Sequence, residues 1–124
     1  MTDTALFIGW GPTIPGREHH ALKLFDEALE IFEAAVAAEE IDSFEPILLG
    51  PHGGELEGFI LVKGEIAKLT AFQMREDVER LRIKAQALKT NFGVVFATIG
   101  DGVKRSFALY DEIVKELERE PAIV

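Results

Sequence analysis

The sequence predicts one α+β domain whose strands and helices follow the order β-α-β-β-α-β-α. Its length of 124 residues is that of a typical single domain. Short apolar runs that end in glycine or proline alternate with longer segments of helical periodicity. Hydrophobic residues make up 48% of the chain, and a folded monomer of this mass exposes only about 6,600 Å² of surface. We therefore expect a single domain over residues 1–124, with ordered structure from about residue 5 to residue 119.

The chain opens with a predicted strand, a loop and a long helix. Residues 5–10 form a short apolar run, which is typical of a strand. Residues 11–16 contain two prolines and two glycines, which predicts a loop. Across residues 17–40, apolar side chains recur with helical spacing, at Ala21, Phe25, Ala28, Leu29, Phe32 and Val36.

A hairpin is predicted next. Residues 43–50 and 58–63 are largely apolar and form two strands joined by the turn Pro51-His52-Gly53-Gly54. Pro46 lies inside the first of these strands and lacks a backbone donor. That strand is therefore expected at an edge of the sheet or at a bulge.

The second half of the chain predicts three helices and one strand. The apolar stripe of the helical region breaks at residues 73–77, which indicates two helices over residues 66–72 and 76–89. Residues 92–99 predict a fourth strand. A C-terminal helix over residues 103–119 carries one apolar side, formed by Val103, Phe107, Tyr110, Val114 and Leu117.

This order is a split β-α-β arrangement with an added C-terminal helix, and each crossover contains a helix, as parallel neighbours require. Such a sheet leaves one face open, and an open face normally alternates apolar and polar residues. These strands do not alternate, because Val94 and Phe96 share one side of the fourth strand while Val95 and Ala97 share the other. We expect both faces to be buried. The C-terminal helix covers part of the second face or, most simply, the sheet of a second copy covers it in a C2 homodimer.

Gly16-Arg17-Glu18 opens the first helix, and residues 44–49 precede the Pro51-His52-Gly53-Gly54 turn. Together with residues 58–64 and Phe92-Gly93-Val94-Val95, these segments resemble the dimeric α/β-barrel superfamily, and within it an uncharacterised bacterial branch. The resemblance covers about residues 5–115. It implies ferredoxin-like β-α-β-β-α-β subunits that pack sheet to sheet, with a ligand cleft between sheet and helices.

The same superfamily includes cofactor-free monooxygenases, haem-degrading enzymes, dye-decolourising peroxidases, muconolactone-isomerase-like enzymes and proteins of unknown role. The fold alone does not choose among these activities.

Composition and charge narrow the classes of partner. The net charge of −9 disfavours nucleic acid, because an acidic surface repels phosphates. The chain contains no cysteine, which excludes disulfides, thiolate metal sites and cysteine nucleophiles. It has neither a basic leader nor an apolar run of membrane-spanning length, so we expect a cytoplasmic protein without a membrane partner.

The charge is also unevenly distributed between the helices. Residues 17–40 hold seven acids and two bases, whereas residues 65–90 hold six bases and four acids. Adjacent helices of opposite charge would pair across their rims, although two solvated helix surfaces explain the same composition.

Three residues are candidates for catalysis. A histidine titrates near neutral pH, so His20 or His52 would be the base, and Arg17 would stabilise an oxyanion. Each has a structural alternative, namely a solvated helix position or an exposed turn.

Four further residues are candidates for contact with a ligand. They are Trp10 at the end of a strand, His19 at the start of the first helix, Arg75 at the helix break and Asn91 before the fourth strand. Packing or solvation is the alternative for each. We expect no metal, because His19 and His20 are adjacent and point about 100° apart on a helix, and we expect no cofactor.

The sequence supports two functions. The first is a small homodimer that binds or transforms an apolar small molecule in a cleft between sheet and helices, as a cofactor-free oxygenase or isomerase would. The second is a non-enzymatic structural or regulatory dimer, favoured by the small number of polar residues suited to chemistry. Whether the protein is an enzyme stays open at this point.

Overall fold

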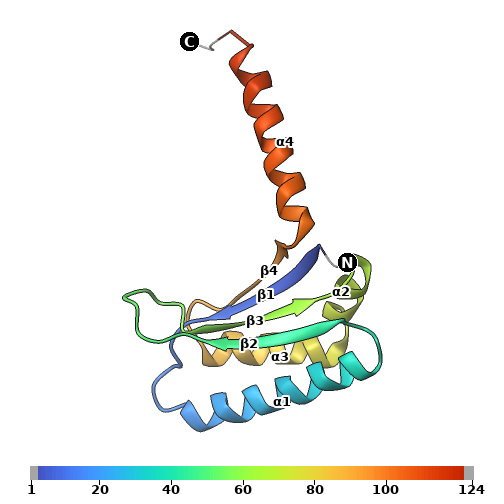
Figure 1. Cartoon of the computed structure of the whole chain (residues 1–124). Helices are drawn as coiled ribbons and strands as arrows, with labels where there is room; N and C mark the ends of the chain where they lie inside the picture. The colour runs from blue at the N-terminus through green and yellow to red at the C-terminus, as the bar shows by residue number, and fades with distance from the viewer. Residues whose placement is uncertain (1–2, 122–124) are drawn as a thin grey trace.

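The computed structural model describes residues 3–121, and in it a four-stranded sheet carries helices on one face only (Figure 1). Every predicted element is confirmed, with ends that differ by at most three residues. The elements are β1 (Thr4–Trp10), α1 (Glu18–Ala37), β2 (Ser43–Leu48), β3 (Gly58–Lys63), α2 (Ile66–Gln73), α3 (Glu76–Leu88), β4 (Gly93–Thr98) and α4 (Asp101–Glu118).

The strand order is β2-β3-β1-β4, and all neighbouring strands are antiparallel. The expectation of parallel neighbours was wrong. The crossovers join β1 to β2 and β3 to β4, and one antiparallel strand lies between the members of each pair, as the split arrangement requires. The edge position predicted from Pro46 is confirmed, since β2 pairs with β3 alone.

Arg75 explains the break between α2 and α3. Its backbone is extended, with φ −66° and ψ 140°, so the helical path stops there and restarts at Glu76. The chain turns at this point, and both short helices keep their apolar sides toward the sheet, where Leu69, Phe72 and Leu81 are buried.

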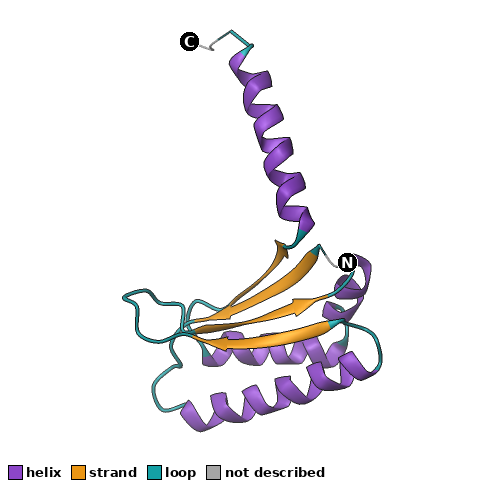
Figure 2. Cartoon of the chain, in the orientation of Figure 1, coloured by secondary structure: helices purple, strands orange, loops and turns teal. Residues whose placement is uncertain are grey.

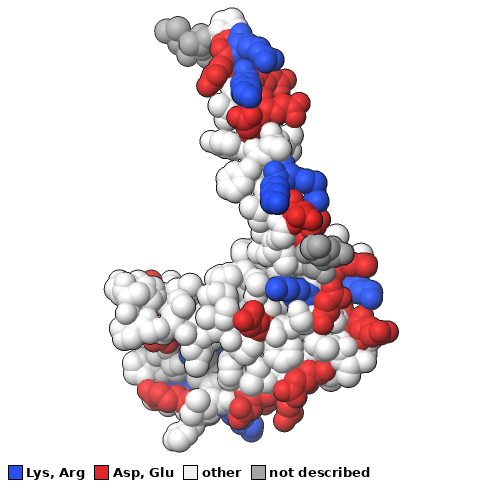
Figure 3. Space-filling view, in the orientation of Figure 1, with Lys and Arg blue, Asp and Glu red and all other residues white. Residues whose placement is uncertain are grey.

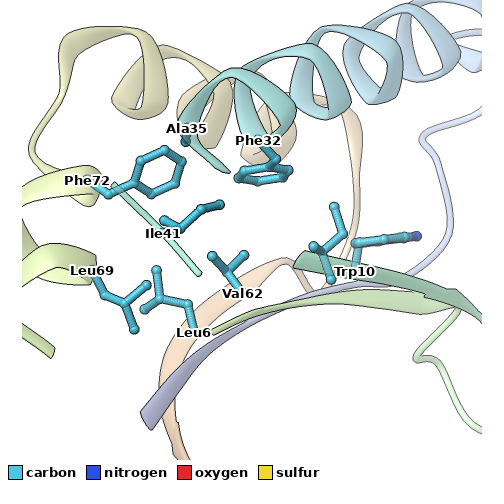
Figure 4. Packing of buried hydrophobic residues seen from close by; sticks show 9 residues of the cluster. Leu6, Trp10, Phe32, Ala35, Ile41, Val62, Leu69 and Phe72 are labelled. Atoms are coloured by element: carbon cyan, nitrogen blue, oxygen red, sulfur yellow. The ribbon is translucent and has the colours of Figure 1, made fainter. Parts of the chain in front are cut away.

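The core lies between the sheet and the helices (Figure 4). Leu6 and Val62 point from β1 and β3 toward the helices and are 1% and 0% exposed. Phe32 of α1 has its ring centroid 5.8 Å from that of Phe72 in α2 and 5.5 Å from that of Phe44 in β2. Each such buried side chain contributes about 1.5–3 kcal/mol, which makes this cluster the main source of stability.

The opposite face of the sheet is apolar as well, and no helix of residues 3–121 covers it. The strand register places Phe7 between Leu61 of β3 and Val95 of β4 on this face. Phe7 also contacts Phe59, with ring centroids 5.0 Å apart. Val95 is 58% exposed. We call this surface, formed by Phe7, Phe59, Leu61 and Val95, the open face.

Helix α4 leaves the end of β4 and projects away from the rest of the chain (Figure 2). The alternative in which this helix covers part of the open face was wrong, because only its first turns contact the sheet. There Arg105 donates a hydrogen bond to the carboxylate of Asp3, which lowers the pKa of Asp3, and Gly102 is buried against Asp3 and Thr98.

The predicted pairing of oppositely charged helices is present. Lys84 of α3 lies 3.2 Å from the carboxylate of Glu27 in α1, and Arg75 lies 2.5 Å from that of Glu40. Acidic side chains gather along α1 at the bottom of the space-filling view (Figure 3). Among the helices of residues 3–121, none is long and apolar enough to cross a membrane.

Candidate ligand cleft

A cavity of about 400 Å³ lies between the sheet, α1 and α3. This volume falls within the range of about 300–1,000 Å³ that small-molecule sites occupy. Leu22 and Leu48 line it and are largely exposed, so the cavity reaches the surface between the start of α1 and the end of β2. Most of its lining is apolar, and it includes Leu6, Ile8, Trp10, Phe25, Ile60, Val78, Phe92 and Val94.

Small side chains explain why this space is empty. Ala21 and Ala28 lie two turns apart on the side of α1 that faces the cavity, and Ala85 faces it from α3. A larger apolar residue at these positions would fill the volume as the phenylalanines do elsewhere in the core.

Trp10 lies in the wall of the cavity and is 9% exposed. Its ring meets the edge of Phe25, with centroids 6.0 Å apart and planes at 68°. Gly58 lies opposite Trp10 on β3, and a Cβ atom there would stand 2.7 Å from the indole Cζ2. The glycine therefore lets the indole lie directly against the strand.

Five polar residues complete the lining, namely Thr13, Glu18, Gln73, Arg82 and Lys89. Arg82 and Lys89 are half-buried, and neither side chain makes an ion pair or hydrogen bond within residues 3–121. Glu18 accepts a hydrogen bond from the backbone N–H of Gly16 at 3.1 Å, and backbone N–H groups at the start of α1 lower the pKa of its carboxyl.

Trp10 alone among the candidates from the sequence lines this cavity. Arg17, His19 and His20 are exposed at the start of α1 and lie outside the lining. The side chains of His19 and His20 take different directions on the helix, and no group of three or more His, Asp or Glu residues in the described part of the chain is arranged to hold a metal.

His52 shapes its own loop. Its Nε2 lies 2.7 Å from the carbonyl oxygen of Leu56, and its Nδ1 accepts the N–H of Gly54 at 3.3 Å. This pairing corresponds to a neutral imidazole that donates from Nε2. Both ring nitrogens are therefore engaged in holding the β2–β3 loop, which favours a structural role.

Arg75 binds carboxylates of this chain rather than standing free for a ligand. It makes two hydrogen bonds to Asp77, of 3.0 and 2.6 Å, and one to Glu40 of 2.5 Å. Its guanidinium carbon also lies 5.5 Å from the centre of the Phe72 ring. These contacts fix the junction of α2 and α3 against the end of α1.

Asn91 similarly connects two parts of the backbone. It adopts a positive φ of 51°, which asparagine tolerates, and its amide donates to the carboxylate of Glu55. It thereby ties the segment before β4 to the β2–β3 loop. Neither Arg75 nor Asn91 lines the cavity.

Arg82 and Lys89 were missed by the sequence reasoning. Arg82 lies in α3 on the side that also carries Val78 and Ala85, and Lys89 directly follows the last residue of the helix. Basic residues that recur on the apolar side of a helix were the available signal.

No family model and no curated protein matches this sequence. Solved structures do share its fold. A dimeric ferredoxin-like protein of unknown function from Thermobifida fusca is 10% identical with a TM-score of 0.61, covering 80% of this chain and 93% of its own. A dimeric protein of unknown function and ferredoxin-like fold from Bacteroides fragilis is 14% identical with a TM-score of 0.55, covering 77% and 96%.

A third solved structure is described as a candidate antibiotic biosynthesis monooxygenase from Chloroflexus aurantiacus. It is 13% identical with a TM-score of 0.52, and the match covers 78% of this chain and 93% of that one. At these identities the similarity is one of fold. It confirms the architecture predicted from the sequence, and the chain has a ferredoxin-like fold extended by α4.

Proposed function

We propose that this protein is a homodimer in which each subunit binds an apolar small molecule with an anionic group in the cleft between the sheet, α1 and α3. The observation that carries the proposal is an apolar cavity of about 400 Å³ whose wall includes two half-buried cations, Arg82 and Lys89, that have no ion-pair or hydrogen-bond partner among residues 3–121. A cation beside an apolar surface gains most from a ligand that supplies both a counter-charge and a hydrophobic body.

The apolar part of the ligand would lie among Trp10, Phe25 and Phe92, where burial contributes about 25 cal/mol per Å². Its anionic end would reach Arg82 or Lys89. The carboxylate of Glu18 lines the same cleft but is already held by backbone N–H groups at the start of its helix, and it would repel a second anion at that end.

Two facts support the homodimer. The fold neighbours from Thermobifida fusca and Bacteroides fragilis are described as dimeric, and the open face of this chain is an apolar surface of the kind that a second sheet would cover. The acidic charge argues against a nucleic-acid partner, and the absence of cysteine fits a reducing compartment such as the cytoplasm.

Binding is supported better than catalysis. The candidate bases His20 and His52 and the candidate oxyanion partner Arg17 stand outside the lining of the cavity. An oxygenase or isomerase reaction, which the resemblance suggests, would need one of these side chains to reach the cleft. A structural or regulatory dimer remains the alternative, in which the cleft is simply loosely packed.

Trp10 is the only tryptophan, so its fluorescence reports on this cleft directly. We would titrate the purified protein with octanoate, octanol and octylamine, which share one apolar chain and differ in charge. Octanoate is expected to change the Trp10 emission at the lowest concentration. The double variant Arg82→Gln/Lys89→Gln should lose the preference for octanoate over octanol.

Arg80→Gln is the matched control, because Arg80 is an exposed base of the same helix that pairs with Glu76 and does not line the cavity. It should bind all three compounds as the original protein does. If none of them changes the Trp10 emission, the cleft is not a site for apolar ligands, and if octylamine binds best, the anionic part of the proposal is wrong.

A further inference from the structure

We propose that α4 is an arm that packs against the body of a second copy of the chain, on residues that precede the partner's own α4. The inference rests on the homodimer of the proposed function and adds to it the element that secures the dimer. Helix α4 takes part neither in the proposed ligand cleft nor in the proposed contact between the two open faces.

The helix has two distinct sides. Val103, Phe107 and Tyr110 recur at helical spacing and continue into Ile113, Val114 and Leu117, which gives one apolar side over its whole length. Phe107 and Tyr110 are each 68% exposed. The other side carries Lys104, Asp111, Glu112 and Lys115, and the charged atoms of α4 are visible in Figure 3.

This apolar side has nothing to pack on within residues 3–121. The hydrogen bond from Arg105 to Asp3 and the burial of Gly102 fix the base of the helix. The C-terminal part of the helix extends free of the sheet (Figure 1). A soluble monomer rarely exposes so continuous an apolar surface.

The area of exposed surface points to a second copy. The chain exposes 8599 Å², about 2,000 Å² more than the roughly 6,600 Å² expected for a compact monomer of this mass. Two copies that each hid this excess would bury about 4,000 Å² in total, which lies within the range of obligate homodimers. A smaller partner, such as a short peptide, would leave much of the excess exposed.

The direction of α4 also fits contact with a second copy of the chain. The helix rises on the side of the sheet opposite α1 and α3, where the partner sheet would stack (Figure 2). Its 18 residues span about 27 Å, whereas two stacked sheets are only about 10 Å apart. The arm is therefore long enough to pass the partner's sheet and lie along the side of its helix layer.

The fold neighbours are consistent with α4 as an addition to a shared core. Their matches cover at most about four fifths of this chain, and 80% of 124 residues is about 99 residues, the length that precedes α4. Sheet stacking would then supply the common interface, and α4 would add affinity to it in this chain.

The test compares two double variants of the full chain by sedimentation equilibrium. Phe107→Gln/Leu117→Gln places amides on the apolar side, and Lys104→Gln/Glu112→Gln makes the same kind of change on the polar side without altering net charge. Glutamine is a good helix former, so both variants keep the helix. The first is expected to weaken dimerisation about 100-fold or more, and the second by less than about threefold.

A photo-crosslinking residue introduced at Tyr110 identifies the surface that α4 contacts. The expected product is a covalent dimer whose crosslinked peptides join α4 to residues 3–100 of the other copy. If the first variant dimerises as well as the original chain, or if the crosslinks stay within one chain or join α4 to α4, the arm proposal is overturned while the dimer stands. A monomer at every concentration would overturn the homodimer and the arm together.

Discussion

The two faces of the sheet have similar compositions, but only one of them is covered by helices within the described chain. Leu6 and Phe7 are neighbours in β1, yet Leu6 lies in the core under the helices and Phe7 lies on the open face. Both faces consist mainly of apolar side chains, although only one is covered within the described chain. The strand pattern therefore describes burial in the proposed assembly rather than in the isolated subunit, and substitutions on each face would distinguish the two.

The largest effect is expected at the helix-covered face. Leu6→Ala removes a side chain that is 1% exposed and leaves a cavity beneath the helices, which should lower the free energy of unfolding by about 2–5 kcal/mol. Urea denaturation measures this change. Since the loss concerns packing within the subunit, it should be the same at low and high protein concentration, and a loss that grows with concentration would argue against it.

The next effect belongs to the open face and should concern assembly alone. Val95→Lys places a charge where the partner sheet would lie, which should weaken the dimer about 100-fold, because a buried unpaired ammonium is costly. The stability of the separated subunit should change by no more than about 0.5 kcal/mol. Sedimentation equilibrium checks the first value and urea denaturation at high dilution the second.

Ala87→Lys provides the control, because Ala87 is also exposed but lies on α3, on the other side of the sheet. It should leave both quantities unchanged. An unaltered dimer in Val95→Lys would show that the open face is not the interface.

The elements could be predicted because their signals are local. Pro46 indicated an edge strand from its missing donor, and the interrupted stripe at residues 73–77 indicated the break that Arg75 makes. The position of α4 could not be predicted in the same way. A helical stripe shows that one side becomes buried, but it does not show which surface covers it, and here that surface lies outside the subunit's own sheet.

The cleft was only partly predictable for a related reason. The resemblance suggested Trp10 as a ligand contact, and the structure places its side chain in the wall of the cavity, while its role in binding stays a prediction. His52 and Arg75 were site candidates because of their residue types, yet their hydrogen bonds go to Leu56 and Asp77. Such partners depend on the path of the backbone, which residue type alone does not specify.

Two loop glycines at the end of the sheet where the cleft lies allow a further comparison. A Cβ atom on Gly11 would stand 2.7 Å from the backbone oxygen of Thr90, which also accepts the N–H of Gly11 at 2.8 Å. Gly11→Ala should therefore cost about 1–3 kcal/mol of unfolding free energy, because the clash is with backbone. Gly50 has no atom within 4 Å of such a Cβ, so Gly50→Ala should change stability by less than about 0.5 kcal/mol. Thermal denaturation of the pair measures the difference, and equal losses would contradict the close approach.

The smallest effect is expected where Arg75 joins the two helices below the covered face. The hydrogen bonds from Arg75 lower the pKa of Asp77, so the carboxylate stabilises the fold while it is ionised. Because the folded pKa is depressed, this stabilisation is fully present above the unfolded value of about 3.9 and is lost as the pH falls through the folded value. The pair is partly exposed, which limits its contribution to about 1 kcal/mol or less.

Asp77→Asn should reduce the free energy of unfolding by that amount at neutral pH and by progressively less in acid, as urea denaturation at several pH values would show. Glu76→Gln, at an exposed neighbouring carboxylate that pairs only with Arg80 in the described chain, is the control for loss of a carboxylate that Arg75 does not bind. If the two variants lose stability equally at every pH, the Arg75–Asp77 pair does not hold the helix junction.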